Sequence, residues 1–151
     1  MDDDSLSVVH LLGANLAFVV AAIHVALGVV NWLKYVSVGI LLPPDFRWPL
    51  FVVSGVALFV GTFLVPWTRH RRALYAGGIL LMVVYVVGYF GWHVGGHRPL
   101  FFAGPGTHHS EPLLSFLLAH LFAGPVEFVA VVAGVSLAAV LAYLLVAESP
   151  G

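Results

Sequence analysis

The sequence predicts an all-α fold, namely an integral membrane bundle of four helices, from two observations. Only 9% of the residues are charged, whereas an ordinary soluble domain carries about 25%. Four segments are almost wholly apolar, and a span needs about 20 such residues to cross roughly 30 Å of hydrocarbon. Within a lipid-exposed segment of this kind only a helix satisfies its backbone polar groups. The predicted spans are residues 8–30, 50–66, 73–92 and 125–146.

Length and composition limit the organisation and the partners of the chain. Its 151 residues suit one transmembrane domain, 1–151, with no separate soluble domain. A net charge of −1 is unsuited to nucleic acid, which needs a clustered basic face. Cysteine is absent, which excludes disulfides and thiolate metal ligands. Asp2, Asp3 and Asp4 stand where a secretory signal would be positively charged, so the first apolar segment is expected to stay as a helix.

The expected location is the cell (cytoplasmic) membrane, crossed several times, with the lipid bilayer as the main partner. Lysine and arginine divide equally between the two sides, but Arg69, Arg71 and Arg72 are packed into one short loop. Because cytoplasmic loops carry an excess of such residues, we place this loop and both termini in the cytoplasm.

Polar and small residues recur at helical spacing within the spans. His10, Ala17, His24 and Asn31 are seven residues apart and fall on nearly one face, which is expected to look into the bundle because polar groups facing lipid are costly. In the second span, Gly55 and Thr62, like Ser54 and Gly61, are spaced for close helix packing. In the third, Gly78, Met82, Tyr85 and Tyr89 form a stripe followed by Trp92 or His93. That stripe suits either a packing seam or a wall for a flat ligand such as haem or a quinone.

Residues 93–124 form a histidine-rich cap between the last two spans. A helix running unbroken from residue 113 to 146 would be about 51 Å long, too long for an upright span. Gly124-Pro125 offers a break, so residues 113–122 are read as a separate interfacial or re-entrant helix. Glu127 then stabilises the start of the last span through the helix dipole. Were that helix continuous, Glu127 would lie deep and need a partner such as His24, Asn31 or His120. The cap holds five of the eight histidines: His93, His97, His108, His109 and His120.

Imidazole suits zinc, copper, nickel and iron, and two histidines can hold a haem iron axially. The candidate metal ligands are His93, His97 and His120, and the candidate ligands for haem b or a transition metal are His24, His93 and His120. Gly95-Gly96 interrupts the helical spacing of His93 and His97, and no H-E-x-x-H motif occurs. The alternatives are solvated histidines in the loop and, for His24, a hydrogen bond between helices.

Several short stretches resemble an uncharacterised family of small four-helix membrane proteins of halophilic archaea. They are residues 21–28 (AAIHVALG), the glycine-spaced residues 51–64, the turn 69–72 and residues 74–78 (LYAGG). More distantly, the layout resembles DoxX-type four-helix proteins. The resemblance implies a four-helix membrane fold, and no catalytic motif of the DoxX-type proteins matches this chain.

Three functions stay open. No nucleophile motif or phosphate-binding loop occurs, so we expect a non-enzymatic membrane protein, either a small binding bundle or a subunit that partners itself or other membrane proteins. The rival is a redox or metal protein holding haem b or a transition-metal ion. A weaker alternative is an oligomeric channel or carrier that uses Glu127.

Overall fold

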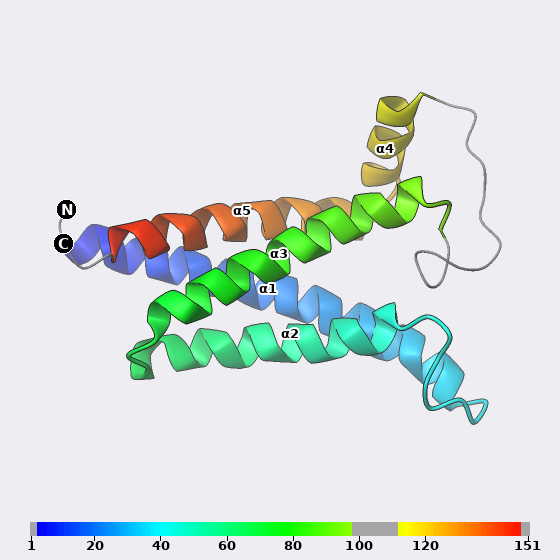
Figure 1. The fold of residues 1–151 in the computed structure, drawn as a ribbon, viewed down its shortest axis with the longest axis horizontal. Helices are drawn as coiled ribbons and strands as arrows, with labels where there is room; N and C mark the ends of the chain where they lie inside the picture. The colour runs from blue at the N-terminus through cyan, green and yellow to red at the C-terminus, as the bar shows by residue number, and fades with distance from the viewer. Residues whose placement is uncertain (1–2, 98–111, 149–151) are drawn as a thin grey trace.

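The computed structural model describes residues 3–97 and 112–148. Four long helices, one short helix and a 3-10 turn build the bundle in Figure 1. The four long helices are each long and apolar enough to cross a membrane. The predicted all-α, four-helix membrane fold is therefore confirmed. The elements in chain order are α1 (Asp3–Val36), α2 (Arg47–Leu64), η1 (Val65–Trp67), α3 (Arg71–Val94), α4 (Leu113–Leu121) and α5 (Pro125–Ala147).

The bundle consists of two helix pairs joined through α1 and α5. Helix α1 packs on α2, α3 packs on α5, and α1 also contacts α5. Figure 1 shows the start of α1 and the end of α5 at one end of the bundle, with α4 at the other. We call these the terminal end and the α4 end. Which end faces the cytoplasm stays a prediction.

Helix α1 is longer than the apolar segment that predicts it, because nothing stops the helix before Gly39. Gly39 has a φ of 83°, and its N–H donates to the Val36 carbonyl while the Ile40 N–H donates to the Tyr35 carbonyl. This pair of bonds is the Schellman motif, in which a residue in the left-handed region closes the helix. Glycine adopts that conformation without steric cost, so it fixes the end of α1.

The predicted break before the last span is present. Gly124 is extended and Pro125 is the first residue of α5. The short helix α4 runs across the long axis of the bundle (Figure 1). Glu127 is exposed in the first turn of α5, with its carboxylate beside Gly124. The alternative of a continuous last helix with a deep Glu127 is therefore wrong.

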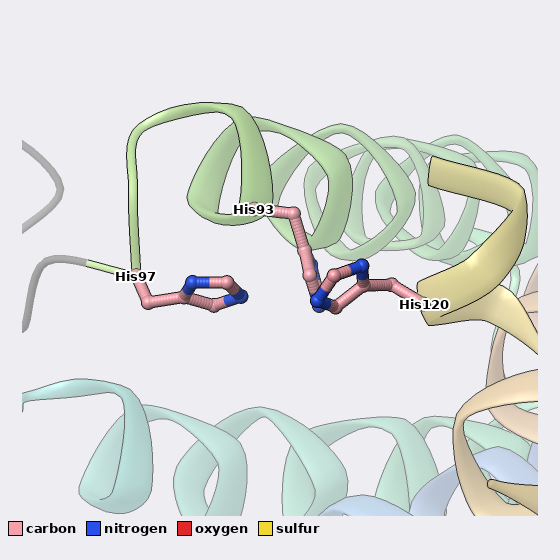
Figure 2. Close-up of side chains that lie close together, drawn as sticks. All are labelled: His93, His97 and His120. Atoms are coloured by element: carbon pink, nitrogen blue, oxygen red, sulfur yellow. The ribbon is translucent and has the colours of Figure 1, made fainter. Parts of the chain in front are cut away.

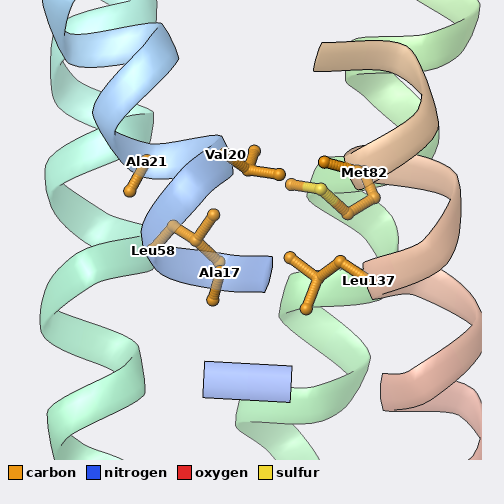
Figure 3. Packing of buried hydrophobic residues seen from close by; sticks show 7 residues of the cluster. Ala17, Val20, Ala21, Leu58, Met82 and Leu137 are labelled. Carbon is orange, nitrogen blue, oxygen red and sulfur yellow. The ribbon is translucent and has the colours of Figure 1, made fainter. Parts of the chain in front are cut away.

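The apolar core lies where α1 meets α3 and α5, and α2 adds Leu58 to it (Figure 3). Val20, Met82 and Leu137 are fully buried there. Their neighbours in this cluster are Ala17 and Leu58. Met82 thus takes the packing role proposed for the stripe on the third span. The core is small, because most apolar side chains lie on the outside of the bundle, where lipid would surround them.

Helices α1 and α2 approach closely at two glycines. A Cβ atom on Gly28 would lie 2.7 Å from the Trp48 carbonyl oxygen, and one on Gly55 would lie 3.0 Å from the Ala21 carbonyl oxygen. Because lipid is as apolar as leucine, helices in a membrane associate through such close packing rather than through apolar burial. Gly61 differs, since a Cβ there would meet nothing within 4 Å.

We predict that Gly28→Ala destabilises the bundle by about 1–3 kcal/mol, the usual cost of overpacking. The new methyl group would press on the backbone of α2, which cannot rotate away. Thermal unfolding in detergent measures the effect, with Gly61→Ala as the matched control, expected to leave the midpoint unchanged or raised. Equal midpoints for the two variants would contradict the packing described above.

Candidate metal centre

Three histidines meet at the α4 end of the bundle (Figure 2). His93 lies on the last turn of α3, His97 just beyond it, and His120 on the last turn of α4. One ring nitrogen from each lies within 4.8 Å of the others, so we call these residues the histidine trio. His93 is buried, whereas His97 and His120 are half-buried.

The turn that ends α3 brings His97 back over the helix. The Gly96 N–H donates to the His93 carbonyl, and the His97 N–H donates to the Trp92 carbonyl. This is a second Schellman motif, with Gly96 at φ 77° in the left-handed region. The motif commonly packs its last residue on the helix, and here the His97 ring lies 4.5 Å from the Trp92 ring, centroid to centroid. The two glycines therefore end the helix and bring His97 beside His93.

His97 itself has a φ of 61°. A non-glycine residue in the left-handed region is uncommon, although histidine is among the residues that tolerate it. Such strain persists only where the surroundings hold the residue in place, and it gathers at functional sites. The histidine trio thus contains a residue that the turn holds in an unfavourable backbone conformation.

Backbone hydrogen bonds orient two members of the trio. Nδ1 of His93 donates to the Tyr89 carbonyl at 2.8 Å, and Nδ1 of His120 donates to the Phe116 carbonyl at 2.9 Å. A carbonyl oxygen can only accept, so the proton of each neutral ring is on Nδ1. The lone pair is then on Nε2, and a bond from the other ring nitrogen to a carbonyl is how protein metal sites fix a histidine ligand.

Aromatic rings enclose the trio. The ring centroid of His93 lies 4.9 Å from the ring centroid of His97 and 4.8 Å from that of His120. Phe116 packs on His120 at 4.1 Å, and Tyr89 packs on His93 at 4.3 Å. These rings limit the rotamers of the histidines and shield them on the side of the bundle.

Arg47 of α2, which is paired with Asp45, contacts Trp92 beside the trio. The Arg47 guanidinium lies 3.9 Å over the Trp92 ring, a cation–π contact. Arg47 Nε also donates to the Asp45 carboxylate at 2.8 Å, with a second bond from Nη2. Asp45 is buried, so its carboxylate balances the guanidinium charge near the trio. Trp92 therefore stands between Arg47 and His97.

Two side chains near the trio carry oxygen atoms, one a carboxylate and the other a hydroxyl. Glu127 lies close enough to interact electrostatically with both His93 and Tyr89. Within the described residues, the Tyr89 hydroxyl is buried and makes no hydrogen bond. Buried polar groups are nearly always paired, so an orphan of this kind needs an explanation, such as an ion or water at the site.

The other candidate residues lie outside the trio. His24 is buried in the bundle, stacked on Tyr85 with ring centroids 3.7 Å apart, and its Nδ1 donates to the Val20 carbonyl. Asn31 donates to the Leu27 carbonyl and accepts from Lys34. Glu127 is at the start of α5. His108 and His109 lie outside the described residues.

Sequence reasoning placed Tyr89 in the stripe that leads to His93 but missed the other residues that surround the trio. Phe116 stands four positions before His120, so helical spacing alone could have indicated it. Arg47 and Asp45 are distant in sequence from Trp92, and only the fold reveals their contact. A second cluster was also missed, in which His10, Tyr75 and Glu148 meet at the terminal end.

The trio has the donor set of a transition-metal site. Three neutral imidazoles suit zinc, copper, nickel or iron. A tetrahedral zinc ion about 2.0–2.1 Å from each nitrogen would hold these nitrogens roughly 3.4 Å apart. They lie within 4.8 Å of one another, so the three nitrogens would move closer together on binding the ion.

Comparison with protein-family models, with curated proteins and with solved structures finds no match for this chain. The resemblance to halophilic membrane proteins therefore stays a prediction, and the function is argued from the site alone.

Proposed function

We propose that this chain is a membrane protein that binds a divalent transition-metal ion through His93, His97 and His120. The convergence of three imidazoles from the end of α3 and from α4 carries the proposal. Hydrogen bonds fix the lone pair of two of the rings on Nε2. Glu127 nearby favours a bound cation, whereas the Arg47 guanidinium, which is paired with Asp45, opposes one.

A bare ion suits this geometry better than haem. Haem iron takes four ligands from the porphyrin and leaves two axial positions. The rings of His93 and His120 lie 4.8 Å apart, which leaves no room for a macrocycle between them. His24, the third residue of the haem hypothesis, is stacked on Tyr85 and is not part of the trio.

Three histidines leave a fourth position on a tetrahedral ion. Structural zinc sites fill all four positions with protein ligands, whereas an open position takes a water or an exchangeable ligand. The trio thus fits a binding bundle that holds an ion exchangeably or shares it with a ligand from another chain. This role agrees with a small binding bundle that needs no catalytic motif of its own.

We predict that the detergent-purified protein binds one Zn²⁺ or Ni²⁺ ion per chain, as isothermal titration calorimetry and elemental analysis would measure. His93→Ala, His97→Ala and His120→Ala each remove a ligand and should weaken binding by about a hundredfold or more, beyond the 10–100-fold loss typical of supporting residues. His70→Ala is the matched control, because His70 is exposed before α3, at its other end.

Binding that survives in all three variants would exclude the trio as the site. Loss in His70→Ala to the same degree would point to surface histidines instead. X-ray absorption of the Ni²⁺ form adds a direct check, since imidazole ligands give a characteristic scattering pattern that the three variants should lose.

A second prediction concerns the turn. Gly96→Ala and Gly39→Ala each place a side chain in the left-handed region, at a cost of about 1–2 kcal/mol. The thermal unfolding midpoint should fall by a similar amount in both variants, because the two glycines close their helices by the same motif. Only Gly96→Ala should weaken the binding of Ni²⁺, because only that turn positions His97. Equal Ni²⁺ affinities for the two variants would contradict the role of the Gly96 turn in positioning His97 for metal binding.

A further inference from the structure

A cavity of about 500 Å³ lies at the terminal end of the bundle, away from the histidine trio. Residues from α1, α2, η1, α3 and α5 line it. Sites for small ligands are typically clefts of 300–1,000 Å³ with a mostly apolar lining and a few polar groups. The volume and lining of this cavity both fall within that description.

The cavity is kept open by small residues that do no packing. Gly61 of α2 and Gly77 of α3 both line it, and a Cβ on either would meet nothing within 4 Å. Gly28 and Gly55, in contrast, bring α1 and α2 into contact. The cavity is partly open to the outside of the bundle, so a molecule dissolved in the membrane can enter it.

Polar groups converge at one side of the cavity. His10 and Tyr75 are among the lining residues. His10 Nδ1 donates to the Leu6 carbonyl at 2.7 Å, and His10 Nε2 lies 2.7 Å from Glu148 Oε1 and 3.1 Å from the Tyr75 hydroxyl. The Leu6 carbonyl accepts from Nδ1, and protonation of Nε2 makes an imidazolium–carboxylate pair with Glu148. The Tyr75 hydroxyl donates to the same carboxylate and keeps lone pairs for a donor.

The charges at this side select the head group of a ligand. The Glu148 carboxylate would repel an anionic head, and the His10 imidazolium would repel a cationic one. Arg71 also lies close enough to act on Tyr75 electrostatically, which further disfavours a cation. An uncharged hydroxyl can donate to the lone pairs of the Tyr75 oxygen without a charge penalty. A carbonyl can only accept, and the O–H of Tyr75 and the N–H groups of His10 already donate to Glu148 and Leu6.

We propose that this cavity binds an uncharged amphipathic molecule from the membrane, with a hydrocarbon body and a hydroxyl head that donates to Tyr75. The hydrocarbon body fills the space beside Gly61 and Gly77. The site is separate from the histidine trio, and neither proposal depends on the other.

Photolabelling in lipid nanodiscs tests the proposal. The probes are a long-chain alcohol and a long-chain methyl ketone with a diazirine near the tail, and the matched fatty acid. The alcohol should label cavity residues such as Leu58 and Leu81, as peptide mass spectrometry would locate, and the ketone and the fatty acid should label them weakly. Excess unlabelled alcohol should compete with the labelled alcohol, whereas excess unlabelled ketone should not.

Three variants test whether the labelled position is the cavity. Gly77→Leu fills open space without touching the backbone, and it should reduce labelling about tenfold, the discrimination one added apolar group causes in a pocket. Gly88→Leu is the matched control, because Gly88 is on the same helix, faces open space and lies outside the cavity lining. Glu148→Gln removes the repulsion and should raise fatty-acid labelling towards that of the alcohol.

Several outcomes would overturn the proposal. They are labelling spread over the outer faces of the helices, equal labelling of Gly77→Leu and Gly88→Leu, or no competition by the unlabelled alcohol. Fatty-acid labelling as strong as that of the alcohol in the unmodified protein would overturn the charge argument and hence the assigned head group. The thermal unfolding midpoint of each variant shows that the labelled protein is folded.

Discussion

The bundle depends on one constraint: in hydrocarbon, apolar burial no longer holds helices together. Lipid solvates a leucine side chain as well as a protein core does, so close backbone approach and a few polar contacts must supply the attraction. Gly28 and Gly55 provide that approach between α1 and α2, where added Cβ atoms would overlap the opposite backbone. Polar contacts then connect the helix ends, through Arg47 on Trp92 at the α4 end and His10 on Glu148 at the terminal end. The small core around Met82 lies between these two sets of polar contacts.

The same constraint governs the histidines. A ring on a membrane helix must satisfy its polar atoms nearby, and four histidines here donate from Nδ1 to the carbonyl four residues earlier. Because Nδ1 is occupied by that bond, the role of each ring depends on what its Nε2 contacts. At His10 it meets a carboxylate, whereas at His93 and His120 it turns towards other imidazoles. His24 instead stacks on Tyr85 in the interior of the bundle. One local rule thus gives three different sites.

The sequence was sufficient for the elements and insufficient for their contacts. Apolar length predicts the four spans, and Gly124-Pro125 predicts the break before α5, because both signals are local. Gly95-Gly96 was read as an interruption between His93 and His97, and it is one in the helix. The Schellman turn nevertheless returns His97 to Trp92 and His93, an outcome that depends on the φ of Gly96 rather than on spacing. The Arg47–Trp92 contact and the cluster of His10, Tyr75 and Glu148 join distant segments, so no local pattern could indicate them.

The separation of the two candidate sites constrains what the bundle can do. Tyr75 and His93 are both on α3, eighteen positions apart, and a helix rises about 1.5 Å per residue, so about 27 Å of helix lies between them. Met82 lies along that stretch, fully buried against α1 and α5. An ion leaving the trio towards the terminal end would shed its hydration in an apolar core with no charge to replace it, at a high cost in free energy. This cost favours a metal site that exchanges its ion at the α4 end alone. It disfavours a path for ions through a single bundle.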